Sequence, residues 1–292
     1  MKVGDAELAY TVVGSGEPVL CIHGVNIADA ILGPLSRCPN LLHEYQFISY
    51  HRAGYHESTL AKPELSVEEG AAHARELLDH LGIQKAHVLA YSFGGIVGFQ
   101  FLLSYPEYAH TAVLLEAYLP REESGAIQAN IDAYVTANEL YTRARAPAEK
   151  LAASQSYQTA ICGASFLSCV DVTCSLDVWD KVTEATDTVF TVDLPAAATW
   201  KFKPSRADDF VSGKGKPTMP VLAVLGMDSE AACPGFRETQ RFLMSWLPQA
   251  ERHGVPNATH GLQMMNPLDV GEACRAFFQK YPMSGGASMT RP

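Results

Sequence analysis

The stretch Leu89–Ala90–Tyr91–Ser92–Phe93–Gly94–Gly95 decides the fold that we expect for this chain. An apolar run of strand length, Ala86–Ala90, leads into it, and an almost wholly apolar segment of helix length, Gly95–Leu103, follows it. A strand that passes directly into a helix around a serine indicates a sharp turn with Ser92 at its tip. Small residues near the serine suit such a turn, because the backbone folds back on itself where larger side chains would collide.

Such a turn exposes the serine hydroxyl at the positive end of a helix, which suits a nucleophile. The same pattern also fits a serine that caps an ordinary helix at its N-terminus. The short motif alone does not separate these interpretations. The rest of the chain has to decide between them.

The bulk composition is that of a folded globular protein. The chain has 292 residues, of which 47% are hydrophobic and 18% are charged. This length fits one large α/β domain, or a domain that carries a sizeable insertion.

The charge balance argues against two classes of partner, and the partner we expect is a small-molecule substrate. The chain has 22 Lys and Arg against 32 Asp and Glu, a net charge of −10. Because this charge repels phosphate backbones and anionic lipids, we expect neither nucleic acid nor a membrane as a partner. The segment Met1–Glu7 lacks the apolar core of a signal peptide. Nothing in the sequence indicates an oligomeric state.

The cysteines indicate free thiols. There are 7, an odd number, and none forms a CxxC pair. This usage predicts a reducing compartment, the cytoplasm, and no zinc site.

Strand and helix patterns alternate up to residue 118. The helix expected after Ser66 has a capping box made by Ser66 and Glu69, apolar residues on one face, and Gly82 to end it. The apolar segment after Ser92 is typical of a buried central helix. The alternation predicts an α/β fold with a mostly parallel central sheet covered by helices on both faces. We expect strands near 6–13, 18–22, 46–50, 86–90 and 111–116.

Between residues 119 and 218 the alternation stops, and the composition becomes mainly helical. We predict a helical lid inserted at the open edge of the sheet, ending in a flexible linker at Ser212–Pro217. The expected organisation is a first core part at 1–118, the lid at 119–218, a second core part at 219–282 and a disordered tail at 283–292. We expect helices at 126–144, 148–162 and 176–189 in the lid, strands at 220–225 and 250–255 after it, and helices at 235–247 and 267–280.

A serine hydroxyl needs a base to remove its proton and an acid to orient that base. Among the 10 histidines, His260 is the best placed candidate, since it follows the last predicted strand in a loop that can reach Ser92. His51 and His56, near another strand end, are rivals. No metal or organic cofactor is needed for this chemistry.

The acid is expected at a strand end on the same edge of the sheet. Asp228 follows the strand at 220–225, which gives the order Ser92, Asp228, His260 along the chain. We therefore favour Asp228. Glu116, at the end of the strand before the lid, is the alternative.

The developing oxyanion requires two N–H donors that are already in place. One is expected from the backbone of Phe93, at the start of the helix. The other is expected from the turn His23–Gly24–Val25, where Gly24 permits close approach and the Val25 N–H is the donor. The other interpretation of this segment is a plain turn.

Four separated features resemble the α/β-hydrolase fold superfamily, of the lid-bearing serine esterase, lactonase or C–C hydrolase type. They are His23–Gly24, Arg52–Ala53–Gly54–Tyr55, Ala90–Tyr91–Ser92–Phe93–Gly94, and Asp228 with His260. The resemblance covers about residues 6–280, and no lid motif matches it. It implies Ser92 as the nucleophile, Asp228 as the acid, His260 as the base, and Val25 and Phe93 as oxyanion donors. Ala90 replaces the common glycine, and His51 stands where many relatives have an acidic residue.

A serine at position 92 disfavours haloalkane dehalogenase and epoxide hydrolase activities, since those members of the fold use an aspartate nucleophile. We expect a carboxylic ester or lactone hydrolase with a small, largely apolar substrate, acting through an acyl-enzyme on Ser92. The alternatives are a hydrolase of the C–C bond of a diketone and a non-catalytic small-molecule receptor of the same fold.

Overall fold

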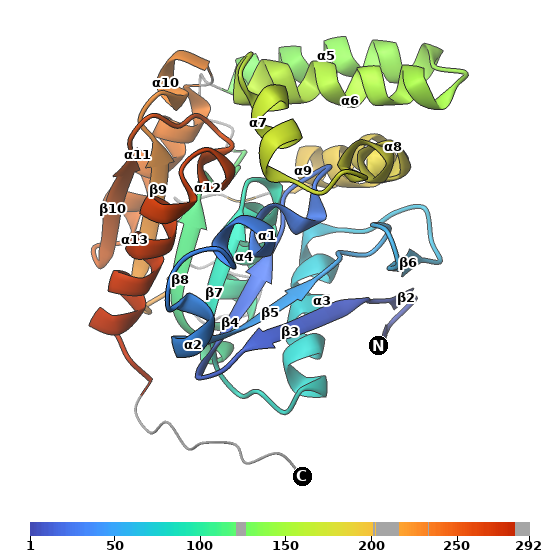
Figure 1. Ribbon diagram of the computed structural model, residues 1–292. Helices are drawn as coiled ribbons and strands as arrows, with labels where there is room; N and C mark the ends of the chain where they lie inside the picture. The colour runs from blue at the N-terminus through green and yellow to red at the C-terminus, as the bar shows by residue number, and fades with distance from the viewer. Residues whose placement is uncertain (121–126, 201, 203–215, 233, 284–292) are drawn as a thin grey trace.

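A seven-stranded, mostly parallel sheet forms the centre of the molecule (Figure 1). The computed structural model describes residues 1–120, 127–200, 202, 216–232 and 234–283. The strand order is β10-β9-β8-β7-β4-β5-β3, and β3 alone runs antiparallel to its neighbour, β5. The strands are β3 (Tyr10–Gly14), β4 (Glu17–Ile22), β5 (Tyr45–Tyr50), β7 (Ala86–Tyr91), β8 (Ala109–Leu115), β9 (Val221–Gly226) and β10 (Ala250–Val255). A small second sheet joins β1 (Lys2–Val3), β2 (Ala6–Glu7) and β6 (Thr59–Leu60).

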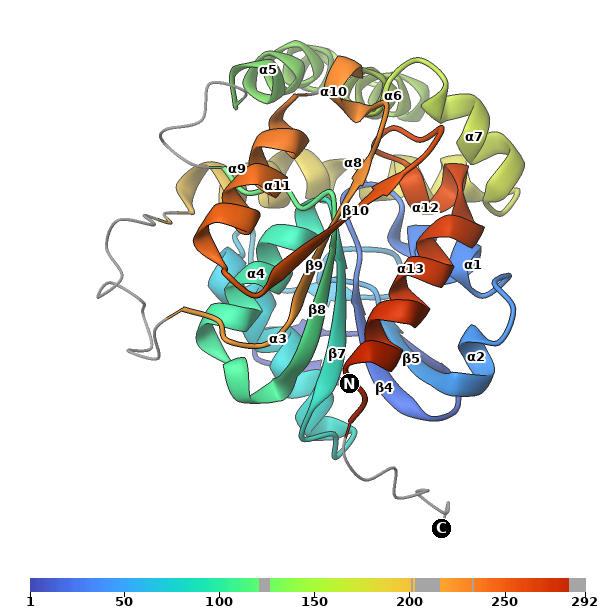
Figure 2. The same cartoon turned by 90° about the vertical axis from the view of Figure 1, so that its left-hand side faces the viewer.

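Helices cover both faces of the large sheet (Figure 2). Successive residues of a strand point to opposite faces, so Val88 and Ala90 of β7 pack in one buried cluster and Leu89 and Tyr91 pack in the other. One face is covered by α3 (Val67–His80), α4 (Phe93–Ser104) and α11 (Gly235–Trp246), and the other by α1 (Leu32–Leu35), α2 (Leu41–Glu44) and α13 (Pro267–Lys280).

The local signals in the sequence correspond to the observed elements. The Ser66 hydroxyl accepts from the Glu69 N–H at 3.1 Å, and the Glu69 carboxylate accepts from the Ser66 N–H at 2.8 Å. Residues 27–43, which Gly33–Pro34 and Cys38–Pro39 interrupt, form the short elements η1 (Ala28–Ala30), α1 and α2. The predicted strand at 6–13 is divided, because β2 and β3 belong to different sheets. The short elements η2 (Pro106–Tyr108), α10 (Ser229–Ala232) and α12 (Leu262–Met265) complete the core.

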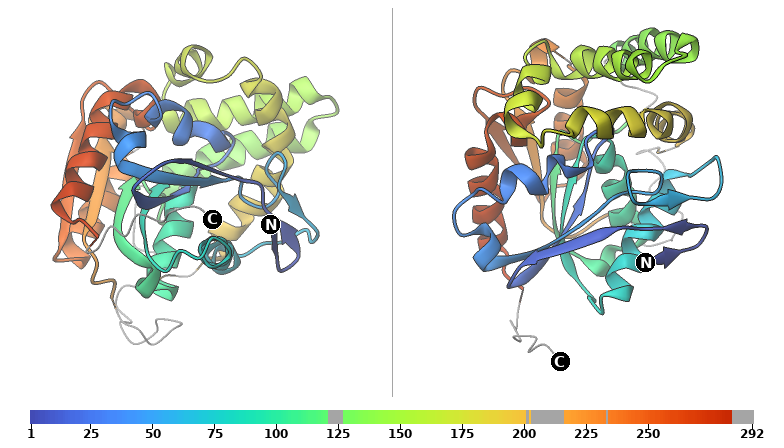
Figure 3. Two further views of the ribbon diagram at one scale, coloured as in Figure 1. Left: turned by 60° about the horizontal axis from the view of Figure 1, so that its bottom comes forward. Right: turned by 45° about the vertical axis from the view of Figure 1, so that its right-hand side comes forward.

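Several helices are inserted in the chain between β8 and β9, and they form a layer over the ends of the strands (Figures 1 and 3). We call the described residues 127–200 the cap. All of its helices fall inside the range 119–218 expected for the lid. Most of the predicted linker at 212–217, and the predicted tail beyond residue 283, lie outside the described residues. The cap contains α5 (Ile127–Arg143), α6 (Pro147–Cys162), α7 (Phe166–Thr173), α8 (Val178–Thr188), the π-helical turn η3 (Val189–Asp193) and α9 (Leu194–Thr199).

Within the described part of the chain, no helix combines the length and apolar character required to cross a bilayer.

The contact between α4 and β7 gives a direct test of the packing. A Cβ atom on Gly98 of α4 would lie 2.6 Å from the Cβ of Ala90, whereas one on Gly70 of α3 would lie 3.5 Å from Val97. We expect Gly98→Ala to lower the free energy of unfolding by about 1–3 kcal/mol through overpacking. Gly70→Ala should be neutral or stabilise the helix by up to about 1 kcal/mol. Urea unfolding of both variants measures the difference, and equal midpoints would contradict the packing.

Candidate active site

Ser92 lies at the tip of a tight turn between β7 and α4. Its backbone has φ 55° and ψ −121°, a conformation that L-residues rarely adopt. A Cβ on Gly94 would lie 2.1 Å from the carbonyl oxygen of Ile22, so only glycine fits there. The Ser92 N–H donates to Leu115 O at 3.0 Å, and its carbonyl accepts from the Tyr118 N–H at 2.9 Å. The turn is therefore hydrogen-bonded to the end of β8 and lies close against the end of β4.

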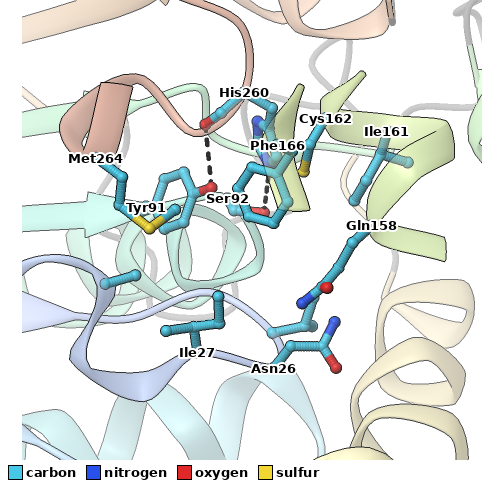
Figure 4. Close-up of a pocket in the computed structure, with 12 residues that line it drawn as sticks. Asn26, Ile27, Tyr91, Ser92, Gln158, Ile161, Cys162, Phe166, His260 and Met264 are labelled. Carbon is cyan, nitrogen blue, oxygen red and sulfur yellow. Dashed lines mark hydrogen bonds between the residues drawn. The ribbon is translucent and has the colours of Figure 1, made fainter. Parts of the chain in front are cut away.

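His260 reaches Ser92 from the loop after β10. Its Nε2 lies 2.7 Å from the Ser92 Oγ, as Figure 4 shows. The imidazole stacks on Phe236 of α11, with ring centroids 4.0 Å apart and planes 8° from parallel. The Tyr91 hydroxyl donates to the backbone carbonyl of His260 at 3.0 Å. Stacking thus holds one face of the imidazole, and the hydrogen bond from Tyr91 holds the backbone of His260.

The carboxylate that contacts His260 belongs to Glu116, which directly follows β8. Its Oε2 lies 2.8 Å from His260 Nδ1, and the residue is 2% exposed. The other oxygen, Oε1, accepts from the Gly226 N–H at 2.7 Å and from the Ser229 hydroxyl at 2.5 Å. Because an ionised carboxylate only accepts, Nδ1 carries the proton and Nε2 is free to accept from Ser92.

The structure does not place Asp228, the acid that we favoured, beside His260. The alternative, Glu116, occupies that position. Asp228 is exposed. Its backbone N–H donates to Ala258 O at 3.0 Å. A Cβ on Gly226 would lie 2.4 Å from that same carbonyl. The loop after β9 is thus held tightly against the loop that carries His260 through backbone contacts, and Asp228 faces solvent.

The two expected oxyanion donors belong to segments that lie close to Ser92. Phe93 begins α4, and the first N–H groups of a helix have no acceptor within the helix. Val25 lines the cavity beside Ser92. A Cβ on the neighbouring Gly24 would lie 3.0 Å from the Cβ of Ser92. Both segments approach the serine closely, and the roles of their N–H groups stay predictions.

His23 is buried and braces this turn. Its Nε2 accepts from the Arg52 N–H at 2.9 Å, so its Nδ1 carries the proton and donates to Gly24 O at 2.7 Å. Burial first, and then the Arg52 charge, lower the pKa of His23 well below its usual value. The imidazole is therefore neutral, as this pair of hydrogen bonds requires.

A buried ion pair joins the same turn to the cap. Arg52 binds both carboxylate oxygens of Asp193, at 2.9 and 2.6 Å, and Tyr55 donates to the second at 2.6 Å. The guanidinium also donates to the carbonyls of His23 and Gly24, each at 3.1 Å. Asp193 belongs to η3, so a cap residue fixes the arginine that holds the turn before Val25.

The rival bases lie away from Ser92. His51 contacts Glu57 at 2.8 Å and Asp29 at 3.4 Å. Burial lowers the pKa of His51, but these carboxylates outweigh it and raise the pKa. The His56 ring packs against His51, with centroids 4.8 Å apart. Neither imidazole contacts Ser92 or Glu116.

A small cavity opens beside the serine, between the core and the cap (Figure 4). Its volume is about 20 Å³, room for about one water molecule. Among the described residues no Asp, Glu, Lys or Arg lines it. The lining residues are Val25, Asn26, Ile27 and Ala30 after β4, Tyr91 and Ser92, then Gln158, Ile161, Cys162 and Phe166 from the cap, and His260 and Met264.

No group of three or more His, Cys, Asp or Glu side chains within the described ranges is arranged to hold a metal ion.

Comparison with known proteins agrees with this fold. The family model for the alpha/beta hydrolase fold matches residues 17–267. The chain belongs to the α/β-hydrolase fold family. The match runs from β4 to the first residue of α13 and includes both strand ends that carry Ser92 and Glu116.

Relatives and solved structures of this family extend the comparison. RutD of Azorhizobium caulinodans, which has the provisional name carbamate hydrolase, is 30% identical over 115 residues, 39% of this chain and 43% of that protein. The chain thus spans less than half the length of the curated relatives it matches. A thermophilic esterase from Thermogutta terrifontis has a TM-score of 0.74 at 20% identity, with 94% of each chain covered. Est816, described as an N-acyl homoserine lactone degrading enzyme, has a TM-score of 0.66 at 15% identity, with 94% of this chain and 98% of that chain covered.

Two supporting residues were missed at the sequence level. Phe236 is one of several aromatic residues on an amphipathic helix, and nothing in its spacing distinguishes a residue that stacks on His260. Asp193 lies in a cap segment that matches no motif. A signal was available for its partner, since Arg52 comes two residues after a mostly apolar strand, where a buried charge requires a counter-ion.

We expect the Arg52–Asp193 pair to contribute more to stability than other ion pairs of the cap, because it joins the cap to the core. Asp193→Asn leaves a buried guanidinium without its counter-charge, and we expect a loss of about 3–5 kcal/mol in the free energy of unfolding. The control is Asp187→Asn, which removes an exposed cap pair with Lys150 at 2.7 Å and should cost about 0–1 kcal/mol. Denaturant unfolding measures both. A loss for Asp193→Asn no larger than that for Asp187→Asn would contradict the inferred attachment.

Proposed function

We propose that this protein is a serine hydrolase that cleaves a neutral, largely apolar carboxylic ester or lactone through an acyl-enzyme on Ser92. The observation that carries the proposal is the unbroken hydrogen-bond chain from the Ser92 hydroxyl through His260 to Glu116, at 2.7 and 2.8 Å. These distances lie within the range for direct proton transfer between a nucleophile and its base.

In the first half of the reaction, Ser92 Oγ attacks the substrate carbonyl as its proton passes to His260 Nε2. The carbonyl oxygen becomes an oxyanion, which accepts from the N–H groups of Val25 and Phe93. Glu116 stabilises the imidazolium that forms. The imidazolium then gives its proton to the departing alcohol oxygen, and the acyl group remains on Ser92.

In the second half, a water molecule replaces the alcohol. His260 Nε2 takes a proton from that water as its oxygen attacks the acyl carbon, and a second oxyanion forms at the same donors. The bond to Ser92 Oγ then breaks, Oγ recovers the proton from His260, and the carboxylic acid leaves. Each half returns His260 to its neutral state, so no co-reactant other than water is needed.

The lining of the cavity supports a neutral substrate. A charged group would lose its hydration beside Ser92 without gaining a counter-ion from the described lining residues. This argues against an anionic substrate, including a carbamate in its anionic form. The names of the esterase and of the lactone-degrading Est816 agree with an ester or lactone.

The cavity volume also indicates that substrate entry displaces part of the cap. Its volume of about 20 Å³ is too small for an ester. Phe166 of α7 forms part of the cavity wall, and a Cβ on Gly261 would lie 2.8 Å from its ring. Movement of α6 and α7 away from the His260 loop would open the site, whereas the Arg52–Asp193 pair holds the other end of the cap in place.

The paired variants Glu116→Gln and Asp228→Asn test the assignment of the acid. A neutral amide neither fixes the imidazole tautomer nor stabilises the imidazolium, so we expect Glu116→Gln to lower kcat on p-nitrophenyl butyrate by about 10³–10⁴-fold. Asp228→Asn changes an exposed residue and should alter kcat by no more than about twofold. Steady-state kinetics on both variants provide the measurement.

The opposite order of effects would assign the acid to Asp228 after a rearrangement of its loop. Absence of turnover by the wild-type protein on p-nitrophenyl esters, lactones and diketones would favour the receptor alternative, and turnover of the diketone alone would favour C–C hydrolysis.

A further inference from the structure

Two buried carboxamides face the cavity beside Ser92 with unpaired polar atoms. Asn26, in the turn after β4, is 1% exposed, and Gln158, in α6 of the cap, is 3% exposed. Within the described part of the chain, Asn26 Nδ2 and Gln158 Oε1 have no hydrogen-bond partner. Both side chains line the cavity.

Unpaired polar atoms at such depth are costly to stability, and native proteins rarely keep them without a reason. Packing alone does not require amides here. Ile27, the residue after Asn26, and Ile161, three residues after Gln158, line the same cavity with apolar side chains. The Asn26 amide is held in place, since its Oδ1 accepts from the Ser154 hydroxyl at 3.1 Å. Its Nδ2 is therefore a fixed donor at the cavity wall.

The position of the two amides indicates which half of the substrate, the acyl half or the alcohol half, they would contact. In Figure 4, Asn26 and Gln158 lie below Ser92, and His260 lies above it. His260 protonates the departing alcohol in the proposed function, so the alcohol half lies on the histidine side. The two amides then face the acyl half.

We propose that Asn26 and Gln158 form an acyl-side subsite that binds a secondary amide in the substrate. The amide carbonyl accepts from Asn26 Nδ2, and the amide N–H donates to Gln158 Oε1. A secondary amide is neutral and offers one acceptor and one donor, which matches the two unpaired atoms and the uncharged lining. The inference rests on the proposed function and narrows its substrate class to esters or lactones with an amide in the acyl group.

The subsite is divided between the two parts of the molecule. Asn26 belongs to the core and Gln158 to the cap, and the two are linked through Ser154, one helical turn before Gln158. Substrate that binds both amides therefore spans the boundary where the cap must move. Binding of the amide favours the cap position in which Gln158 reaches it.

Two esters of equal size test the subsite. p-Nitrophenyl N-acetylglycinate carries a secondary amide in its acyl group, and p-nitrophenyl 4-methylpentanoate is its all-carbon counterpart. The quantity to measure is the ratio of their kcat/KM values, because differences in intrinsic reactivity cancel when variants are compared with the wild type. We expect Gln158→Met and Asn26→Leu each to lower this ratio by about tenfold.

The control is Gln128→Met, which makes the same exchange on α5 at an exposed position paired with Asp132. Its ratio should equal that of the wild type. If Gln158→Met does not fold, as judged by its unfolding transition, Gln158→Asn withdraws the same amide and should give the same fall.

A ratio that stays at the wild-type value in either the Asn26 or the Gln158 variant overturns the subsite, while turnover of both esters leaves the proposed hydrolase intact. No turnover of either ester by the wild type contradicts the hydrolase itself, and the subsite with it. The two failures are therefore distinguishable.

Discussion

The backbone turn at Ser92 is the constraint on which the rest of the site depends. Its positive φ of 55° directs the chain from β7 into α4 within one residue. Close contacts on both sides make the turn possible only with glycine at neighbouring positions, since a Cβ on Gly95 would lie 2.4 Å from that of Ala117. Strained residues of this kind persist where the surrounding structure determines them fully, and they concentrate at functional sites.

A positive backbone φ angle also occurs at Glu116. Its φ is 39°, and the residue directly follows β8, the strand beside β7. Its N–H donates to Val224 O at 3.0 Å, so its backbone is anchored to the third strand, β9. Three adjacent strands thus fix the serine and the carboxylate independently of the cap. His260 comes from a loop, and the stacking of Phe236 and the hydrogen bond from Tyr91 hold it in place.

The sequence predicted the alternation of strands and helices and two of the three linked side chains, Ser92 and His260, because these depend on local patterns. Apolar periodicity, Ser66 with Glu69, and the small residues near Ser92 all act within a few positions. The sequence did not decide between Asp228 and Glu116, because both follow strands and their loops determine which carboxylate turns inward. That choice depends on contacts between distant segments, such as Gly226 against Ala258. Asp193 and Phe236 were missed for the same reason.

The most direct measurement is the site of covalent modification by an organophosphate that mimics the ester, such as diethyl p-nitrophenyl phosphate. After reaction, the protein is digested and its peptides are mapped by mass spectrometry. The account predicts one diethylphosphoryl group per chain, on Ser92, formed much more slowly when His260 is replaced by asparagine. Modification of a different residue, or ester hydrolysis by a protein whose Ser92 stays unmodified, would contradict it.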